Sequence, residues 1–394
     1  MQETDVAIVG GGLAGSLIAA ALGRAGIAAV LIDPHARYPA ELRCEKLHAG
    51  QVDILRRTGL ADAVLRASTP DREVWIARFG YLLQKRASDQ YGILYDTMVN
   101  TVRAEIPADV GMVISKATAL ATGLERQTVT LGNGETISAR LVVLATGLNI
   151  GLRHQVGLTR EVISPCHSIT LGFDMVPVGR AAFDFPALTY YPERSRDRAA
   201  YLTLFPIGTT MRANLMVYRD VGDPWLHRMR HQPNEALVAL MPRLPRITGA
   251  FDIPGPVKIR PADLYVTHGH RQGGIVLAGD AFATSCPAAG TGSDKVFTDV
   301  ERLCNVHIPQ WLATEGMAED KIAAFYDDPV KRACDEASLA KAYQLRSMSI
   351  DDAPIWRLHR WARFLARAAQ GRLEQWSGIG RAASRPPRGL TSRS

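Results

Sequence analysis

The sequence predicts an α/β fold in which a parallel-sheet domain is interrupted by a mostly antiparallel β-sheet domain and followed by a C-terminal helical tail. Three observations lead to this prediction. An apolar segment at the N-terminus is followed at once by a glycine-rich turn and an Ala- and Leu-rich segment. Segments between residues 73 and 219 alternate or run apolar as strands do. An arginine-rich segment with helical spacing begins near residue 355.

The first 33 residues have the order of a βαβ unit. Residues 5–9 are predicted as a buried strand, 16–25 as a helix, and 28–32 as a second strand that closes with Asp33. The turn Gly10-Gly11-Gly12-Leu13-Ala14-Gly15 joins the first strand to the helix. A carboxylate placed like that of Asp33 can accept from a ribose hydroxyl, so the whole order predicts a Rossmann-type dinucleotide site.

The three spaced glycines each have a physical task in such a site. Gly10 permits the tight turn, Gly12 lets the backbone approach a pyrophosphate, and Gly15 allows close packing of helix on strand. Leu13 and Ala14 of this turn are also candidate cofactor-binding residues. The N-terminus of the helix that follows would offer free N–H groups and the positive end of its dipole to the phosphates.

Charge and composition exclude several other classes of protein. The net charge of +7 is concentrated at the end of the chain, because residues 355–394 hold nine Arg and one acid, Glu374. The remainder is near neutral, which argues against a nucleic-acid-binding main domain. There is no run of eighteen apolar residues, so no transmembrane helix is expected. Glu3 and Asp5 argue against a signal peptide, and we expect a cytoplasmic protein.

No metal site is expected from the cysteines or histidines. The five cysteines are scattered without a CxxC pair, which favours free thiols in a reducing compartment. His268 and His270 form an HxH pair, but no carboxylate or cysteine cluster accompanies them.

A second motif begins at residue 274 and carries a resemblance. A predicted strand ends in Gly279-Asp280-Ala281, and after Pro287 the turn Gly290-Thr291-Gly292 precedes a predicted helix over 294–303. This segment, with Asp299 in the helix, resembles in register the p-hydroxybenzoate hydroxylase-like group of FAD-dependent monooxygenases. The resemblance implies that FAD is the cofactor. It also implies that Asp280 binds the ribityl or phosphate end of FAD, and that the 290–292 turn faces the pyrimidine edge of the flavin ring.

Other positions either follow or depart from that family. Arg43 matches a position that contacts the cofactor. Thr146 replaces the mid-chain Asp associated with FAD and NAD(P)H, so electrons are expected either from NAD(P)H or from a separate flavin reductase. Ala283 replaces a common histidine, and Tyr95 replaces an arginine. Lys295, near the first turn of the helix, either steadies an anionic flavin or substrate, or reaches solvent or pairs with Asp294 or Asp299.

The chain divides into three predicted parts. The FAD-binding domain comprises residues 1–74, 92–163 and 261–350, and the substrate-binding β-sheet domain comprises 75–91 and 164–260. A basic helix and a disordered tail occupy 351–394. On the strand over 199–205 and its neighbour over 211–219, alternation predicts an aromatic wall for a flat apolar substrate. The candidate substrate residues are Tyr201, Phe205, Met216 and Tyr218. The alternative is that these side chains face a helix and belong to the core, because alternation does not show which face is turned inward.

The basic segment over 356–367 is predicted as a helix with Arg357, Arg360, Arg363 and Arg367 on one face. Trp and Arg on an amphipathic helix are typical of peripheral membrane contact. The alternative is a helix that docks on the body and presents its arginines to solvent.

The leading functional prediction is a monooxygenase that hydroxylates an aromatic or apolar small molecule with O₂ through a flavin C4a-hydroperoxide. No catalytic side chain is predicted, because the oxygen transfer itself requires no acid or base. Two alternatives stay open. One is another flavoenzyme on the same scaffold, namely a reductase, dehydrogenase, halogenase or cyclase. The other is a non-catalytic, flavin-binding, membrane-associated protein.

Overall fold

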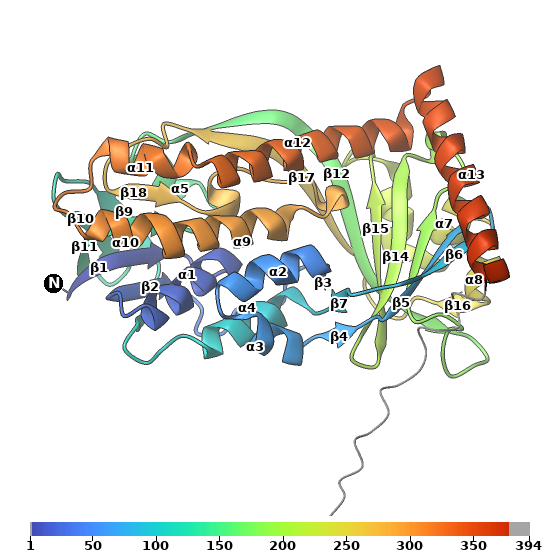
Figure 1. The fold of residues 1–394 in the computed structure, drawn as a ribbon, viewed down its shortest axis with the longest axis horizontal. Helices are drawn as coiled ribbons and strands as arrows, with labels where there is room; N and C mark the ends of the chain where they lie inside the picture. Colours follow the sequence, from blue (N-terminus) through green and yellow to red (C-terminus); the bar gives the residue numbers. More distant parts are fainter. Residues whose placement is uncertain (1, 378–394) are drawn as a thin grey trace, which may run out of the picture.

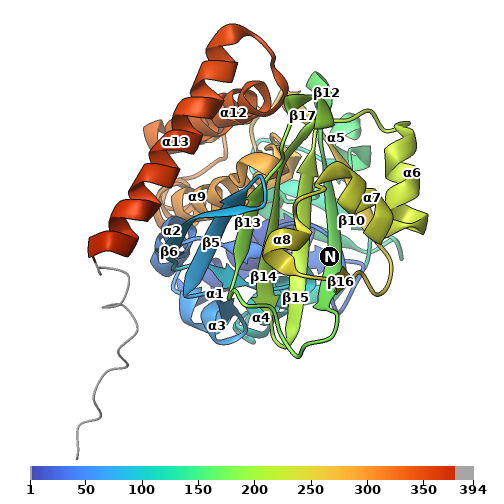
Figure 2. The same cartoon turned by 90° about the vertical axis from the view of Figure 1, so that its right-hand side faces the viewer.

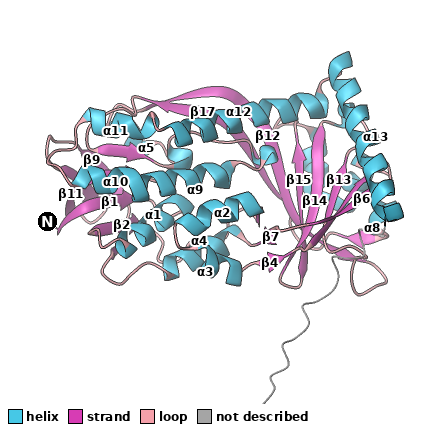
Figure 3. Ribbon diagram, viewed as in Figure 1, coloured by secondary structure: helices cyan, strands magenta, loops and turns pink. Residues whose placement is uncertain are grey.

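A computed structural model describes residues 2–377, which form two large β-sheets and a small three-stranded sheet between them (Figure 1). The predicted α/β fold, with an inserted and mostly antiparallel sheet and a C-terminal helix, is confirmed. Figure 3 shows the two sheets at opposite ends of the molecule, with helices packed beside the N-terminal sheet. Helices α12 (Pro329–Ile350) and α13 (Pro354–Ser377) extend along and then across the second sheet.

Within the described range the N-terminal sheet has seven strands, and the βαβ unit lies at its centre. Its path is β8 (Gly111–Ile114), β2 (Ala29–Asp33), β1 (Gln2–Val9), β11 (Thr136–Leu144), β10 (Gln127–Leu131) and β9 (Ala117–Ala121), with β18 (Ile275–Leu277) beside β11. Strand β1 runs parallel to β2 and β11. Val6 and Ile8 pack on the helix side, and Ala7 and Val9 pack on the opposite side. Both faces are buried, which explains the continuous apolar run.

Helices cover the side of this sheet on which Val6 and Ile8 lie. They include α1 (Leu13–Arg24), α4 (Tyr95–Ala104) and α9 (Gly292–Arg302). Helices α1 and α9 each begin two or three residues before their predicted starts, because the glycine turns lead directly into the first helical turn.

The second sheet has eight strands in the described range. Its path is β16 (Phe251–Asp252), β12 (Thr159–Pro177), β15 (Thr210–Val217), β14 (Ala199–Ile207), β13 (Leu188–Tyr191), β5 (Glu73–Arg78) and β6 (Tyr81–Ala87), with β17 (Lys258–His268) beside β12. Strands β5 and β6 form an antiparallel hairpin. Strand β14 continues to Ile207, and Gly208 reverses the chain with φ of +59°.

One face of this second sheet is covered by helices α6 (Pro224–His231), α7 (Pro233–Leu240) and α8 (Pro245–Thr248), as Figure 2 shows. Trp225, Leu226 and Leu237 pack there against strand residues such as Leu202 and Leu215. The opposite face of this second sheet is therefore turned toward the N-terminal domain. Strands β12 and β17 run through the predicted domain boundaries at 163/164 and 260/261.

Short elements connect these layers. They are β3 (Lys46–Leu47), β4 (Thr69–Pro70), β7 (Tyr91–Gly92), α2 (Ala49–Arg57), α3 (Ala61–Arg66), α5 (Gly151–Gln155), α10 (Ile308–Leu312) and α11 (Glu319–Tyr326), with 3₁₀ or π turns η1 (Ser195–Asp197), η2 (Gly279–Ala281), η3 (Pro287–Ala289) and η4 (Leu303–His307).

The C-terminal helix differs from the expectation that a docked helix would present its arginines to solvent. Helix α13 docks on the body, but Arg360 and Arg367 face the body instead of solvent. The reason is that backbone carbonyls of the body accept hydrogen bonds from Arg360, and an aromatic ring of the body packs against the guanidinium of Arg367.

The predicted disorder after residue 378 lies outside the described residues. No helix within 2–377 is long and apolar enough to cross a bilayer.

Candidate functional site

A cavity of about 1090 Å³ lies between the two large sheets. One end is lined by the turn before α1 and by the end of β2, and the other end is lined by strands β13, β14 and β15. Drug-sized ligand pockets span about 300–1,000 Å³, so this cavity has room for a large cofactor and a smaller molecule beside it. We call the first part the cofactor end and the second part the sheet end.

The glycine turn at the cofactor end is shaped by backbone contacts. Gly10 has φ of +103°, and a Cβ there would lie 2.5 Å from the Ala145 carbonyl oxygen. A Cβ on Gly15 would lie 1.8 Å from the Gly10 carbonyl oxygen. Gly12 differs, because its Cβ would meet no atom closer than 3.8 Å, the ring of Tyr38, and would enter the cavity.

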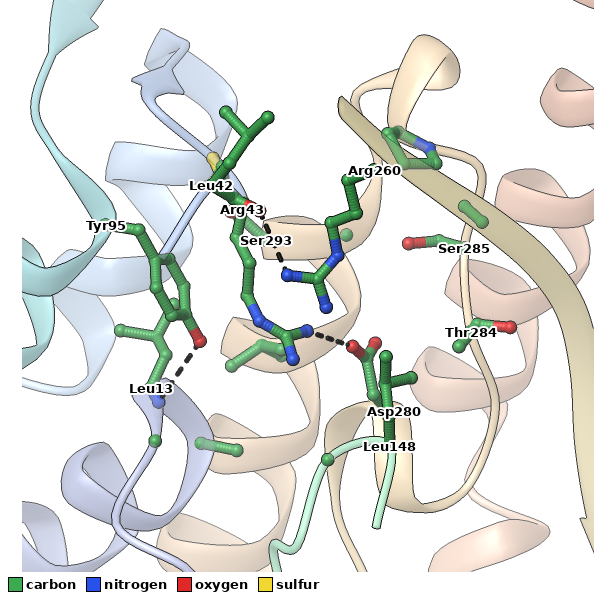
Figure 4. A pocket seen from close by; sticks show the side chains of 18 of the residues that line it. Leu13, Leu42, Arg43, Tyr95, Leu148, Arg260, Asp280, Thr284, Ser285 and Ser293 are labelled. Atoms are coloured by element: carbon green, nitrogen blue, oxygen red, sulfur yellow. Dashed lines mark hydrogen bonds and ion pairs between the residues drawn. The ribbon is translucent and has the colours of Figure 1, made fainter. Parts of the chain in front are cut away.

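Helix α1 begins at this turn without a side-chain cap. Gly12 is the N-cap residue, and Leu13 and Ala14 line the cavity. The Leu13 N–H donates to the Tyr95 hydroxyl oxygen at 3.4 Å, as Figure 4 shows. Burial raises the pKa of Tyr95 to about 12, so the phenol stays neutral. The remaining free N–H groups of the first turn are available to an anion in the cavity.

Asp33 lines the cavity at the end of β2 and also holds the glycine turn. Its carboxylate accepts from the N–H groups of Gly11 at 2.7 Å and His35 at 2.8 Å. It pairs with the buried guanidinium of Arg103 at 3.2 Å. A carboxylate has about four acceptor positions, so a ribose hydroxyl can still bind.

Arg103 is a residue that sequence reasoning missed. Its Nε and Nη2 donate to the Gly11 carbonyl oxygen, and its Nη1 donates to the His35 carbonyl oxygen. In the sequence it is one cation in the last turn of α4, a common place for arginine.

Arg43 and Asp280 meet across the cavity. The Arg43 Nη1 donates to an Asp280 carboxylate oxygen at 2.7 Å (Figure 4). The Arg43 Nε lies 2.9 Å from a Glu41 carboxylate oxygen. Burial alone would raise the pKa of Glu41, but Arg43, Tyr38 and Arg260 lower it to about 2. The loop after β2 is therefore joined by an ion pair to the second motif, and both predicted cofactor residues line the cavity.

The Gly290–Gly292 turn at the start of α9 forms the facing wall. Pro287, Gly290 and Gly292 line the cavity, and α9 also begins without a side-chain cap. Gln51, which sequence reasoning did not assign to the site, donates through Nε2 to the Gly290 carbonyl oxygen and to Asp294, both at 2.9 Å. This amide fixes the turn against α2.

Two predicted cofactor residues of this wall point away from the cavity. The Thr291 hydroxyl lies 2.6 Å from the hydroxyl of Ser338 on α12. The Lys295 ammonium lies 3.1 Å from the Asp335 carboxylate and donates to the Ala283 carbonyl oxygen. Neither side chain lines the cavity. Both sit on the face of α9 that packs on α12, so they anchor that helix.

A buried ion pair holds the second motif in place. Lys331 of α12 lies 2.7 Å from Asp299 of α9, and the other oxygen of Asp299 accepts from the Gly279 N–H at 2.8 Å. Both side chains are almost fully buried. Burial raises the pKa of Asp299, and the charge of Lys331 opposes that shift. Gly279 and Asp280 are thereby fixed relative to the start of α9.

The sheet end contains only part of the predicted wall. Tyr201 and Met216 line the cavity, together with Thr203 and Asn214. Phe205 lies outside the lining, where it packs with Val74, Ala187 and Ile207.

Tyr218 also lies outside the lining, beneath α12. It packs edge-on to His167 and joins a small cluster with Cys286. Thr189 and Tyr191 of β13 do line the cavity. Sequence reasoning missed them because β13 has only four residues and no clear alternation.

A polar network supports this wall from the cofactor side. The buried carboxylate of Glu45 accepts from Arg212 at 2.8 and 2.9 Å and from the Asn214 amide at 2.9 Å.

Thr146, at the position where the family has Asp, lines the cavity and donates to the Asn149 carbonyl oxygen. This position therefore offers a hydroxyl and no carboxylate.

The residues present fit an FAD molecule. Two helix N-termini without side-chain caps, those of α1 and α9, line one cavity from different sides. The first suits phosphates, and the second suits the negative charge of a reduced flavin ring. Asp33 and Asp280 supply acceptors for hydroxyl groups between them. No cluster of three or more His, Cys, Asp or Glu side chains within 2–377 is placed to hold a metal ion.

Comparison with known proteins gives a family and a fold. A family model described as an FAD binding domain matches residues 3–308. A ubiquinone hydroxylase, UbiL, of Rhodospirillum rubrum is 30% identical over 222 residues, which are 52% of this chain and 48% of that protein. The chain thus matches about half the length of that relative. The 3-demethoxyubiquinol 3-hydroxylase of Escherichia coli is 27% identical over 339 residues, covering 77% of this chain and 80% of that protein.

Among solved structures, p-nitrophenol 4-monooxygenase PnpA from Pseudomonas putida superimposes with a TM-score of 0.71. The match covers 99% of this chain and 100% of that chain at 16% identity. At this identity the likeness shows the fold alone.

Proposed function

The chain belongs to the p-hydroxybenzoate hydroxylase-like family of FAD-dependent oxidoreductases, and from that premise we propose that it hydroxylates the ring of a phenol or hydroquinone with O₂. One oxygen atom enters the ring, the other leaves as water, and NADH or NADPH supplies the electrons. The observation that carries the proposal is the continuous cavity from the turn before α1 to the aromatic wall of β14 and β15. Bound, reduced flavin supplies the oxygen-activating chemistry.

The chain's own residues bind and orient both molecules. The N-terminus of α1, Asp33 and Asp280 would hold the cofactor at one end, and the N-terminus of α9 would face its ring. The substrate would lie against Tyr201 and Met216, because an aromatic ring and a thioether favour a flat apolar molecule. A hydroquinone is favoured over other rings because the two matched relatives are named as hydroxylases of ubiquinone or a ubiquinol.

The source of the electrons is a second part of the proposal. Thr146 leaves the cavity without the carboxylate that the family associates with NAD(P)H. Electrons would then reach FAD from NADH or NADPH directly, or through a separate flavin reductase, and the experiment below separates these routes.

The test is oxygen-isotope incorporation. Purified protein with bound FAD is incubated under isotope-labelled O₂ with a panel of phenols and short-chain quinols. Parallel samples contain NADH or NADPH with and without an added flavin reductase. We expect a hydroxylated product with one labelled oxygen atom. Turnover without O₂, or a product free of label, would contradict the proposal, and turnover only with reductase would assign the electron route.

A further inference from the structure

The outward face of α13 is apolar along its described length. Residues at three- and four-residue spacing share the side turned from the body and are all exposed. This outward stripe consists of Ile355, Leu358, Ala362, Leu365, Ala369 and Leu373. The leucines are 60–69% exposed: Leu365 60%, Leu358 68% and Leu373 69%. A surface helix normally turns such a stripe toward the core, so the arrangement is inverted.

The opposite face of α13 is fixed to the body and sets this orientation. Phe364 packs edge-on to Phe79 with ring centroids 5.5 Å apart, and Trp361 stacks on the same ring at 6.1 Å. A Cβ on Gly371 would lie 1.9 Å from the Leu83 carbonyl oxygen, so the helix lies directly on β6. Phe79 itself has φ of +56°, a strained conformation for an aromatic residue that its packing against α13 helps to offset.

Three arginines complete this docking, and one of them, Arg363, donates through Nη1 to the Met348 sulfur at 2.5 Å. Arg360 Nη1 donates to the backbone carbonyl oxygens of Met348 at 3.2 Å and Asp351 at 2.7 Å. The guanidinium of Arg367 lies 4.8 Å from the ring of Tyr191, which lines the sheet end of the cavity. The outward stripe therefore cannot turn inward without breaking these contacts.

The charge beside the stripe identifies the kind of partner. Arg357 and Arg372 are exposed on the same helix, and residues 353–373 contain no acid. An apolar stripe between cations matches the boundary between acyl chains and anionic headgroups. A second copy of this chain fits less well, because paired stripes would bring like charges together.

We propose that α13 is an interfacial helix, which lays the outward stripe on an anionic lipid surface and holds the sheet end of the cavity beside it. The link to the cavity is direct: Arg367 covers Tyr191, and the Tyr191 ring lies 6.3 Å from that of Tyr201. The inference stands apart from the proposed hydroxylation, because lipid binding requires no turnover.

Vesicle flotation of the full chain tests this proposal. We expect flotation with vesicles of phosphatidylglycerol and phosphatidylcholine, and far less with phosphatidylcholine alone. The double variant L358S/L365S should lower the partition coefficient roughly tenfold or more. R357Q/R372Q should lower it about fivefold for each charge and weaken its salt dependence. The matched control is L124S, because Leu124 is 93% exposed on a different part of the molecule.

Thermal unfolding and FAD content of each variant, which should equal those of the parent, show that the proteins are folded. The proposal is overturned if the parent chain does not float, or if L358S/L365S floats as well as L124S does. It is also overturned if sedimentation velocity shows a dimer that L358S/L365S dissociates while vesicles bind neither protein. That last result would make a second copy the partner.

Discussion

The two ends of the cavity are built on different principles. At the cofactor end, the ligand would meet backbone N–H groups at two helix N-termini, and glycines set their approach. At the sheet end, it would meet the side chains of Thr189, Tyr201 and Met216, which come from three strands. A backbone site leaves a local motif in the sequence. A side-chain site depends on which face of each strand is turned inward, and the sequence does not record that face.

The largest effect is expected at the cofactor end, from Gly15→Ala. Its Cβ would lie 1.8 Å from the Gly10 carbonyl oxygen, so α1 must separate from β1. Overpacking of this kind costs about 1–3 kcal/mol or more, and FAD binding should be lost with it. Absorbance of bound flavin and thermal unfolding measure both effects.

Gly12→Ala is the matched control for that prediction. Its Cβ would meet no atom within 3.8 Å and would enter the cavity. Its unfolding temperature should stay near that of the parent while FAD affinity falls. An equal loss of stability in Gly15→Ala and Gly12→Ala would contradict the assignment of helix packing to Gly15 and of cofactor approach to Gly12.

The next largest effect is expected at the buried ion pair of Lys331 and Asp299, which holds the second motif in place. Lys331→Met leaves Asp299 as an unpaired buried carboxylate, which costs about 3–5 kcal/mol. Chemical denaturation should report that loss, together with weaker FAD binding, since Asp299 holds Gly279. The neighbouring Arg332→Met removes an exposed pair with Glu336 and should change stability by less than about 0.5 kcal/mol. Similar results for both would refute the role given to Lys331.

The sheet end should respond in KM and leave FAD affinity unchanged. Tyr201→Leu removes an aromatic ring from the cavity wall, and a ring contact is worth about 0.5–1.5 kcal/mol. We therefore expect KM for an aromatic substrate to rise by about three- to tenfold in steady-state kinetics. Tyr81→Leu, at an exposed site on β6, is the control. A loss of FAD from Tyr201→Leu would mean that the two ends are not separate.

The smallest effect is a pH dependence at the cofactor end. The pKa of Glu41 is lowered from 4.5 to about 2 in the folded protein. A lowered pKa stabilises the fold above pH 4.5, and that contribution is lost as the pH falls toward 2. The difference in unfolding temperature between the parent and Glu41→Gln should therefore shrink across this window. A constant difference would contradict the ion pairs of Glu41 with Arg43 and Arg260.

The contrast between the backbone site at the cofactor end and the side-chain site at the sheet end explains which features the sequence could predict. The βαβ order and the second motif predicted the fold and the places of Gly10, Gly12, Asp33 and Asp280, because turn geometry is local. The direction of Lys295 was not predictable, since it depends on Asp335, which arrives from α12.

The remaining differences have the same cause. Phe205 lies on β14, and Tyr218 lies one residue beyond the end of β15, but neighbouring elements pack against both side chains outside the cavity. Arg103 and Gln51 act through backbone carbonyls that are distant in sequence, so no local pattern marks them. In α13 the spacing predicted a helix with two faces, and only the docking contacts show which face is outward.

The central claim is that one cavity holds the cofactor at the turn before α1 and the substrate against β14 and β15. A crystal structure of the FAD-loaded protein tests it most directly. The account predicts the pyrophosphate at the N-terminus of α1 and the flavin ring between the Gly290–Gly292 turn and the face of the sheet that carries Tyr201 and Met216. A flavin ring that lies outside this cavity, or that fills the sheet end and leaves no room for a substrate, would contradict it.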